Sequence, residues 1–307
     1  MKLSQTNGPS FNFYSTHAET ISHLNKCGFR HVDISFFTKF MKGSIYFSDD
    51  YMKVVNEYKE AFKKFDITPV QCHEPAGNNI GDDNGQYYHK KAVRAIEMAA
   101  KIGCPCMTIH PGKKHTPMTK DEFVTGNIES IRKMIPLIEE YGLMLLFENI
   151  ESYENNYFAT TADDVIAVID GIGHPLIQAC WDVGHAHING LNQYDEITKL
   201  GNRLKSLHIH DNLGLINQKG VNTLALSDMH TIPFFGNINF DDIMKGLIDI
   251  NYTGTFNFEV SAIKKHMARP DVNKNIDKFN PDVQISSDTL LYQIGKHILK
   301  SYNCYEY

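Results

Sequence analysis

Four short apolar runs in this chain each end in, or run into, a side chain that can bind a metal ion. The runs are LLFENIE (145–151), ACWDVGH (179–185), LHIHDN (207–212) and TFNFEV (255–260), and the metal-binding residues are Glu148, Asp182, His208 and Glu259. Each run has the character of a β-strand, and the strands of a parallel barrel all end on one rim, where functional residues gather. Two glutamates, one aspartate and one histidine meeting there would form an oxygen-rich site for a divalent cation.

Further ionisable groups stand at the ends of other strand-like runs or directly after them. They are His73, His110, His185, His210, Asp228 and His230. Several carboxylates buried in one place would repel one another unless a cation compensated their charge. The common placement of these groups therefore predicts a metal site. Four residues would bind the metal ion directly, and the others would either line the pocket around it or bind further ions.

The elements that must position these residues alternate along the whole chain. Strand-like runs lie near 2–5, 30–34, 68–73, 105–110, 143–148, 177–182, 204–210 and 254–260, and helix-like stretches include 51–65, 87–103, 122–142, 240–250 and 286–302. Eight strand–helix units in 307 residues predict an α/β fold, a (β/α)₈ TIM barrel that forms a single domain over residues 1–307. A doubly wound open sheet is the alternative, but it usually has a glycine-rich phosphate turn after its first strand, and SQTNGPSFNFY (4–14) is not such a turn.

Composition narrows the class of protein. With 42% hydrophobic residues the chain can bury a large core, and a formal net charge of −6 argues against a nucleic-acid-binding surface. No run approaches the ~18 apolar residues of a membrane span, and the N-terminus lacks the apolar stretch of a signal peptide. The six cysteines have no disulfide-rich spacing. We therefore expect a cytoplasmic protein with reduced cysteines and no membrane contact.

Two connections are longer than the others. Residues 36–50 follow the second strand and are rich in aromatic side chains, and residues 262–282 follow the eighth strand and are polar. Long loops on the catalytic rim of a barrel serve as lids or as contacts with a neighbouring subunit, and both interpretations stay open here. Phe36, Phe37 or Phe40 would suit a wall for the carbon face of a sugar, or equally the buried packing of a lid.

The order and spacing of the motifs resemble those of the xylose isomerase-like barrel superfamily, which contains the sugar phosphate isomerases/epimerases and the endonuclease IV enzymes. The resemblance runs over most of the chain and is sharpest from 143 to 260. It is carried by GFRHVDIS with Asp33, TIHPG with His110, FENI with Glu148, WDVGHAHING, HIHDN, and the closing stretch DMHTIPFFGNINFDDIMKGLIDINYTGTFNFEV.

The resemblance implies a divalent-metal-dependent isomerase or epimerase that acts on a sugar or sugar phosphate. Glu148, Asp182, His208 and Glu259 would hold one Mn²⁺, Mg²⁺, Co²⁺ or Zn²⁺ ion, which would stabilise the enediolate formed when a C–H next to a carbonyl loses its proton. Glu148 and Glu259 would act as base and acid. His185, His73, His110, His210 and Asp33 would line the substrate pocket, and Asp211 would orient His208 or contact substrate. A homodimer or homotetramer is expected, as in many members of the family.

Endonuclease IV enzymes, which cut DNA at abasic sites with three zinc ions, are the competing interpretation. All nine positions that match their ligands carry a suitable side chain: His73, His110, Glu148, Asp182, His185, His208, Asp228, His230 and Glu259. The sequence around these positions differs from that family, since EPAGNNIG follows His73 and VGH follows Asp182. Basic or aromatic loops that would bind and bend DNA are not evident in the sequence either. We therefore favour the sugar enzyme. A third class, a lyase or a sugar-sensing barrel that kept the metal site, also stays open.

Overall fold

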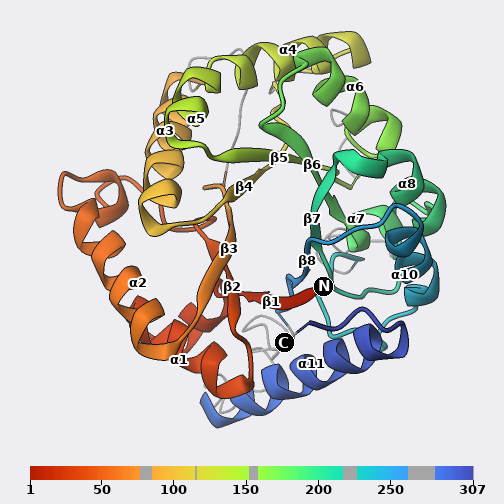
Figure 1. The fold of residues 1–307 in the computed structure, drawn as a ribbon. Helices are drawn as coiled ribbons and strands as arrows, with labels where there is room; N and C mark the ends of the chain where they lie inside the picture. Colours follow the sequence, from red (N-terminus) through yellow and green to blue (C-terminus); the bar gives the residue numbers. More distant parts are fainter. Residues whose placement is uncertain (77–84, 115, 152–157, 217–226, 262–280, 307) are drawn as a thin grey trace.

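A sheet of eight parallel strands forms the centre of the computed structural model, which describes residues 1–76, 85–114, 116–151, 158–216, 227–261 and 281–306. The strand order is β7-β6-β5-β4-β3-β2-β1-β8, and Figure 1 shows these strands as a ring with the helices outside it. The strands are β1 (Lys2–Thr6), β2 (His31–Ser35), β3 (Thr68–His73), β4 (Cys106–Ile109), β5 (Met144–Glu148), β6 (Ile177–Asp182), β7 (Leu204–His208) and β8 (Thr255–Phe258). The predicted TIM barrel is confirmed.

The ring closes between β7 and β8 through a single bridge. Ile209 pairs with Phe258, the Ile209 N–H donates to the Asn257 carbonyl at 2.8 Å, and the Glu259 N–H donates to the Ile209 carbonyl at 3.0 Å. The strands predicted over 204–210 and 254–260 therefore end two residues earlier than expected, at His208 and Phe258. This closure lies at the carboxyl end of the barrel, beside two of the four predicted metal ligands.

The helices surround the strands and cover their outer face. They are α1 (His17–Cys27), α2 (Tyr51–Phe65), α3 (Gly85–Ile102), α4 (Lys120–Arg132), α5 (Ile135–Tyr141), α6 (Ala162–Ile172), α7 (Val183–Ile188), α8 (Gln193–Leu200), α10 (Phe240–Asp249) and α11 (Pro281–Ser301), with short 3₁₀ turns at Pro9–Asn12, Ile45–Phe47 and Gly201–Arg203. The last helix, α11, packs beside α1, which brings the two ends of the chain together (Figure 1). Among the described residues, no helix combines the length and the apolar character needed to cross a membrane.

Local sequence explains most helix boundaries. Thr16 and Glu19 form a capping box at the start of α1, in which each side chain binds the other residue's backbone N–H. The helix predicted over 122–142 is instead two helices, α4 and α5, which separate around Lys133 and Met134. Pro136 lies in the first turn of α5, where its missing N–H is tolerated but would have interrupted one continuous helix.

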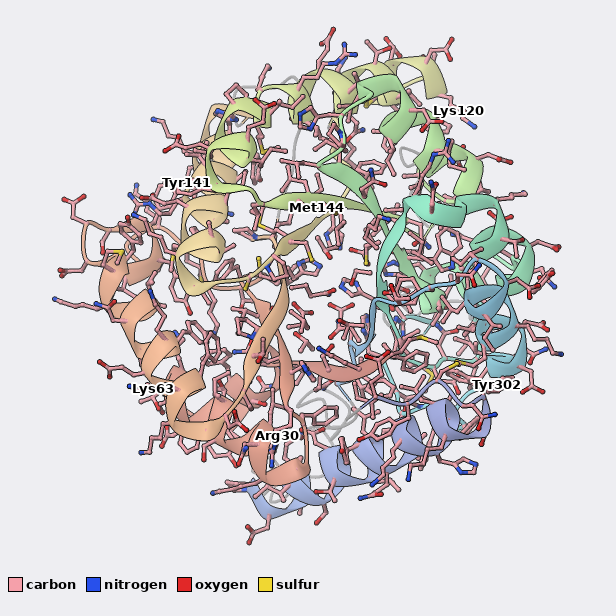
Figure 2. The ribbon with its side chains drawn as sticks, viewed as in Figure 1. Arg30, Lys63, Lys120, Tyr141, Met144 and Tyr302 are labelled. Carbon is pink, nitrogen blue, oxygen red and sulfur yellow. The ribbon has the colours of Figure 1, made fainter. Side chains whose placement is uncertain are left out.

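The inside of the barrel is polar, whereas the layer between strands and helices is apolar. Ser4 donates to the Asn257 side chain at 2.5 Å, and Asn257 donates to Asp33 at 3.3 Å, all within the ring. Trp181 is fully buried and donates from its indole nitrogen to Gln193 at 3.2 Å, as expected for strand–helix packing. Figure 2 shows side chains filling both regions. These polar side chains continue along the inside of the barrel to the rim at the carboxyl ends of the strands.

Candidate metal centre

Three carboxylates converge on one ring nitrogen of His208. Nδ1 of His208 lies 2.7 Å from Oε1 of Glu148, 3.3 Å from Oε2 of Glu259 and 3.9 Å from Oδ2 of Asp182. One ligand atom from each of these four residues lies within 4.8 Å of all the others. Their four strands end on the same rim, so the structure brings together the four predicted metal ligands.

A hydrogen bond with Gln71, inside the barrel, holds the His208 ring in this orientation. Its second nitrogen, Nε2, lies 3.1 Å from the side-chain amide of Gln71, and the Ser206 hydroxyl is hydrogen-bonded to the same amide. A histidine that binds a metal through one nitrogen is commonly fixed through a hydrogen bond at the other. Sequence reasoning missed Gln71, although its position two residues before His73 places it on the same face of β3 and was a usable signal.

Backbone carbonyls orient three further histidines of the rim. The Nδ1–H group of each histidine donates to a carbonyl oxygen, in the pairs His73 with Glu74 (2.9 Å), His185 with Asn149 (3.0 Å) and His230 with Glu259 (2.8 Å). A neutral imidazole that donates from Nδ1 keeps its lone pair on Nε2. In the neutral form each ring would offer Nε2 as its ligand atom, and in the structure each Nε2 faces a carboxylate: Glu148 at 3.8 Å from His73, Glu151 at 3.4 Å from His185 and Asp228 at 2.9 Å from His230. These residues supply part of two further groups.

The first of these groups joins the third and fourth strands to Glu148. Oε2 of Glu148 lies 3.2 Å from Nε2 of His110 and 3.8 Å from Nε2 of His73, and the three residues have ligand atoms within 4.8 Å of one another. The ring of Phe37 stands edge-on to both histidines, with ring centroids 5.5 and 5.9 Å away. Phe37 is 42% exposed, whereas Phe36 and Phe40 are buried in the core. Of the three aromatic residues proposed as a wall, Phe37 is the one that borders the site.

The second group lies on the other side of Asp182. His185, Asp228 and His230 have ligand atoms within 4.8 Å of one another, and Nε2 of His230 lies 2.9 Å from Oδ2 of Asp228. His210 stands between this group and Asp182: its ring stacks on His230 at 4.0 Å, and its Nε2 lies 3.2 Å from both oxygens of Asp182. The structure thus brings every predicted rim residue into one continuous cluster.

Asp33 lies deeper than the other predicted site residues. It is fully buried inside the barrel, where burial raises the pKa of its carboxyl to about 6. Its contact with Asn257 places it beneath the rim, and its role in substrate binding stays a prediction.

The electrostatics of the cluster favour bound positive charge. Burial alone would raise the pKa of Glu148, but His208 and His110 outweigh it and hold that pKa well below its usual range. Burial likewise opposes ionisation of Asp182, yet His185 and His210 lower its pKa to about 2. Within the described part of the chain, the ion pairs of Glu148, Asp182 and Glu259 involve histidines only. Oxygen and imidazole ligands with a surplus of negative charge fit a divalent cation.

Two carboxylates beside the cluster were not predicted. Glu74 accepts the backbone N–H of His110 at 2.6 Å, and burial raises its pKa to about 7. Glu151 lies 3.4 Å from Nε2 of His185, and burial raises its pKa as well. Both residues are nearly fully buried. The signal was present in the sequence, since Glu74 directly follows His73 and Glu151 belongs to the FENIE string.

Asp211 does not have the first of its two expected roles, the orientation of His208, and its contact with substrate stays a prediction. Its carboxylate accepts backbone N–H groups of the loop that precedes α10, from Phe234 at 2.8 Å, Gly236 at 3.0 Å and Ile238 at 3.1 Å. It also accepts its neighbour's N–H, from Asn212 at 2.9 Å. With both oxygens engaged in this way, Asp211 holds a loop in place and does not orient His208.

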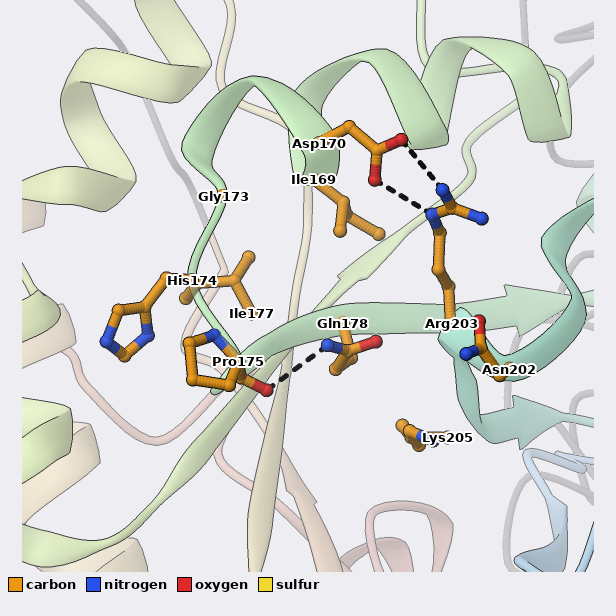
Figure 3. A pocket seen from close by; sticks show the side chains of 10 residues that line it. All are labelled: Ile169, Asp170, Gly173, His174, Pro175, Ile177, Gln178, Asn202, Arg203 and Lys205. Carbon is orange, nitrogen blue, oxygen red and sulfur yellow. Dashed lines mark hydrogen bonds and ion pairs between the residues drawn. The ribbon is translucent and has the colours of Figure 1, made fainter.

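A cavity of about 420 Å³ lies at the opposite end of the barrel and takes no part in this site. Figure 3 shows it lined by residues at the starts of β6 and β7, among them Ile177 and Lys205. Arg203 closes one side of it through two hydrogen bonds of 2.8 Å to Asp170. The lining of the cavity includes none of the predicted site residues.

Comparison with known proteins agrees with this architecture. A fructoselysine 3-epimerase of Shigella flexneri is 23% identical over 217 residues, which cover 69% of this chain and 73% of that protein. The crystal structure of a D-tagatose 3-epimerase-like protein superposes with a TM-score of 0.75 at 18% identity, covering 99% of this chain and 98% of the other. A second crystal structure, of an IolI protein with a bound zinc atom, has a TM-score of 0.74 at 16% identity and covers 98% and 99% of the two chains.

A protein-family model extends the similarity to most of the sequence. The model described as xylose isomerase-like TIM barrel matches residues 21–279, which include all of the predicted rim residues. The eight parallel strands and the surrounding helices are those of such a barrel. The chain belongs to the xylose isomerase-like TIM barrel family.

Proposed function

We propose that this protein is a divalent-metal-dependent isomerase or epimerase that acts on a ketose or a ketose derivative. The observation that carries the proposal is the convergence of Glu148, Asp182 and Glu259 on Nδ1 of His208. Relatives named as a fructoselysine 3-epimerase and a D-tagatose 3-epimerase-like protein support the substrate class. The ion would be Mn²⁺, Mg²⁺, Co²⁺ or Zn²⁺, and the relative with a bound zinc atom supports a metal in this fold.

Glu148 and Glu259 are the proposed acid and base. A divalent ion held by the four ligands would polarise a substrate carbonyl and stabilise the charge that develops when the adjacent C–H is deprotonated. Histidine contacts lower the pKa of both carboxyls against the effect of burial, so either can be ionised and accept the proton of the C–H. The other carboxyl would take up a proton from solvent before it acts as the acid. Return of the proton to the opposite face of the same carbon gives epimerisation, and return to the neighbouring carbon gives isomerisation.

The remaining rim residues would bind the substrate. His185, His73 and His110 flank the four-ligand group, and their Nε2 atoms point towards Glu148 or Glu151. We propose that these three form hydrogen bonds with sugar hydroxyls, with His210 and Asp33 contributing as well. The ring of Phe37 would face the carbon skeleton of the sugar.

Hydrogen exchange tests this proposal directly. The Mn²⁺-loaded protein, incubated with a panel of ketoses in D₂O, should wash deuterium into the carbon next to the carbonyl of at least one of them. Glu148→Gln and Glu259→Gln should each slow that exchange by about 100-fold or more, because general acid–base catalysis contributes 10²–10⁴-fold. Glu139→Gln, at an exposed glutamate on α5, is the matched control and should leave the rate unchanged. Absence of exchange across the panel would contradict the proposal.

Hydrolysis of a phosphodiester by a zinc cluster is the second candidate function. The groups His73–His110–Glu148 and His185–Asp228–His230 favour it, because they flank the four-ligand group as two further metal sites would. Zinc near three equivalents at the rim and cleavage of a duplex that carries an abasic site would support it. Near one equivalent at the rim and no cleavage would exclude it.

A further inference from the structure

A second cluster of ligand-type side chains lies between α1 and α11, away from the rim. His23 and Cys27 stand one turn apart on α1, and Gln284 and Asp288 stand one turn apart on α11, so four side chains meet across the contact of the two helices. None of the four is more than 2% exposed. Residues spaced by four lie on the same helix face, which is the arrangement that builds metal sites between paired helices.

The donor atoms gather around one nitrogen of His23. Nε2 of His23 lies 2.6 Å from Oδ2 of Asp288 and 3.8 Å from Sγ of Cys27, and the three ligand atoms lie within 4.8 Å of one another. The other nitrogen, Nδ1, is 3.3 Å from the Tyr14 hydroxyl. A nucleophile–base–acid relay would use the two nitrogens for two different partners. Here the Cys27 thiol and the Asp288 carboxylate both lie next to Nε2 of His23, as the ligands of one metal ion would.

Two buried oxygens of this cluster lack partners. Oδ1 of Asp288 and Oε1 of Gln284 are enclosed and accept no hydrogen bond from the described residues. A buried carboxylate or amide oxygen without a partner is costly, by about 1–3 kcal/mol for each group, and such groups are few in folded proteins. This independent observation indicates that a positively charged ligand belongs between the two helices.

We propose that His23, Cys27 and Asp288 form a zinc site that joins α11 to α1. The Gln284 amide, whose Nε2 donates to Oδ2 of Asp288 at 2.9 Å, would have to turn over to offer its oxygen for the fourth position. A thiolate and a carboxylate together balance the charge of Zn²⁺, which makes the ion compatible with burial. The sulfur ligand disfavours Mg²⁺ and Ca²⁺, which take oxygen ligands. Ligand atoms around tetrahedral zinc stand roughly 3.3–3.7 Å apart, given bonds of about 2.0–2.3 Å. The distance of 3.8 Å between Sγ of Cys27 and Nε2 of His23 is close to this spacing. The distance of 2.6 Å between Nε2 of His23 and Oδ2 of Asp288 would have to increase by less than about 1 Å.

This site is separate from the rim in position and in chemistry. It would join the start of the last helix to the first helix, which pack side by side (Figure 1). The rim groups offer only nitrogen and oxygen ligands, whereas the site between α1 and α11 includes sulfur. Zinc bound to sulfur therefore reports on the helix site whether or not the rim binds a metal.

X-ray absorption at the zinc edge tests the proposal on the whole protein produced in zinc-supplemented medium. The wild type should show a sulfur neighbour at about 2.3 Å. Cys27→Ser should lose that neighbour and one zinc per chain, and Asp288→Asn should bind this zinc at least ~10-fold more weakly. Cys180→Ser is the matched control, because Cys180 is the thiol near His208, and it should retain both signals.

Three outcomes would overturn the zinc site. The wild type could lack a sulfur neighbour, the signal could persist in Cys27→Ser, or it could disappear in Cys180→Ser. The first and third outcomes need only the wild type and the control, so the proposal stays testable if Cys27→Ser does not fold.

Discussion

His208 is the residue on which the rim site depends most. Its Nδ1 is the point that Glu148, Glu259 and Asp182 approach, and its Nε2 is fixed by Gln71. Both nitrogens of the fully buried ring therefore have partners: Nδ1 faces the three carboxylates, and Nε2 faces Gln71 in the barrel interior. The orientation of this ring therefore depends on a residue that does not itself touch the proposed ion.

Replacing Gln71 tests this dependence. Gln71→Met keeps the size of the side chain but removes the partner of His208 Nε2, so we expect metal affinity to fall by 10- to 100-fold, the usual effect of losing such a partner. Competition with a fluorescent chelator would measure it. Gln178→Met, on β6 away from the rim, should leave the affinity unchanged. Equal affinities for the two variants would show that Gln71 does not position His208.

Phe37 provides a test of the proposed sugar-binding wall. Phe37→Ala should raise KM for the accepted ketose by about 5- to 50-fold, because burying an aromatic face contributes about 1–2 kcal/mol, and it should change kcat less. Met41→Ala is the control, since Met41 belongs to the same connection and is 69% exposed. A loss confined to kcat, with KM unchanged, would place Phe37 outside the substrate contact.

Single residues show where sequence reasoning reaches its limit. Glu148, Asp182, His208 and Glu259 could be predicted to meet because each ends, or directly follows, a strand and the ends of parallel strands share one rim. The role of Asp211 could not be predicted, because its partners are backbone N–H groups more than 20 residues later in the chain, at Phe234 and beyond. Such a partnership leaves no periodic signal in the sequence.

At the scale of elements, the loop at 234–238, which precedes α10, is held by one carboxylate. Asp211 accepts N–H groups from Phe234, Gly236 and Ile238, and a Cβ at Gly236 would lie 2.2 Å from the Asn212 carbonyl oxygen. Only glycine fits that close approach. Asp228 and His230 lie shortly before this loop in the chain, so its conformation bears on the position of part of the rim cluster.

Asp211→Asn should therefore destabilise the fold and disturb the rim. The amide replaces one accepting oxygen by a donor that faces backbone N–H groups, and we expect a loss of about 2–3 kcal/mol in the free energy of unfolding. Urea denaturation would measure it. Asp121→Asn, on the exposed first turn of α4, should change the stability by less than about 0.5 kcal/mol. A difference between the two variants of under ~0.5 kcal/mol would contradict the role assigned to Asp211.

The helices differ in how far they could be predicted. The long amphipathic helices, such as 51–65, follow their apolar periodicity and appear where expected. The short helix α7 was not expected, because six residues are too few for a periodic pattern, although Asp182 caps it by accepting the His185 N–H at 2.6 Å. A proposed metal ligand thus also serves as a helix cap, which ties the proposed site to the local fold.

At the scale of the whole molecule, the closed barrel could be predicted from the alternation of strands and helices, and the residues that pair to close the ring could not. The Ile209–Phe258 bridge joins segments nearly 50 residues apart, and nothing in either segment alone indicates the pairing. The connection predicted as a lid or subunit contact, 262–282, lies almost wholly outside the described residues, and its role stays a prediction, as do the homodimer or homotetramer and the cytoplasmic location.

Removing metal should weaken the whole fold, because the rim links several strands. A ligand present at 100 times its Kd adds about 2.7 kcal/mol to stability, so chelation should lower the Tm of the metal-loaded protein by several degrees. Differential scanning calorimetry with and without chelator would measure the shift. Asp182→Asn should show a smaller shift, since it lacks one ligand. Identical melting curves for loaded and chelated wild type would contradict a metal that links the strands.

Anomalous X-ray diffraction at the absorption edge of the bound metal tests the central claim most directly. Crystals of the Mn²⁺-loaded protein should give a strong anomalous peak among Glu148, Asp182, His208 and Glu259, and crystals of Glu148→Gln should lose it or show it weakened. A loaded crystal with no peak among these four residues would contradict the proposed metal centre, and with it the proton-transfer chemistry assigned to the rim.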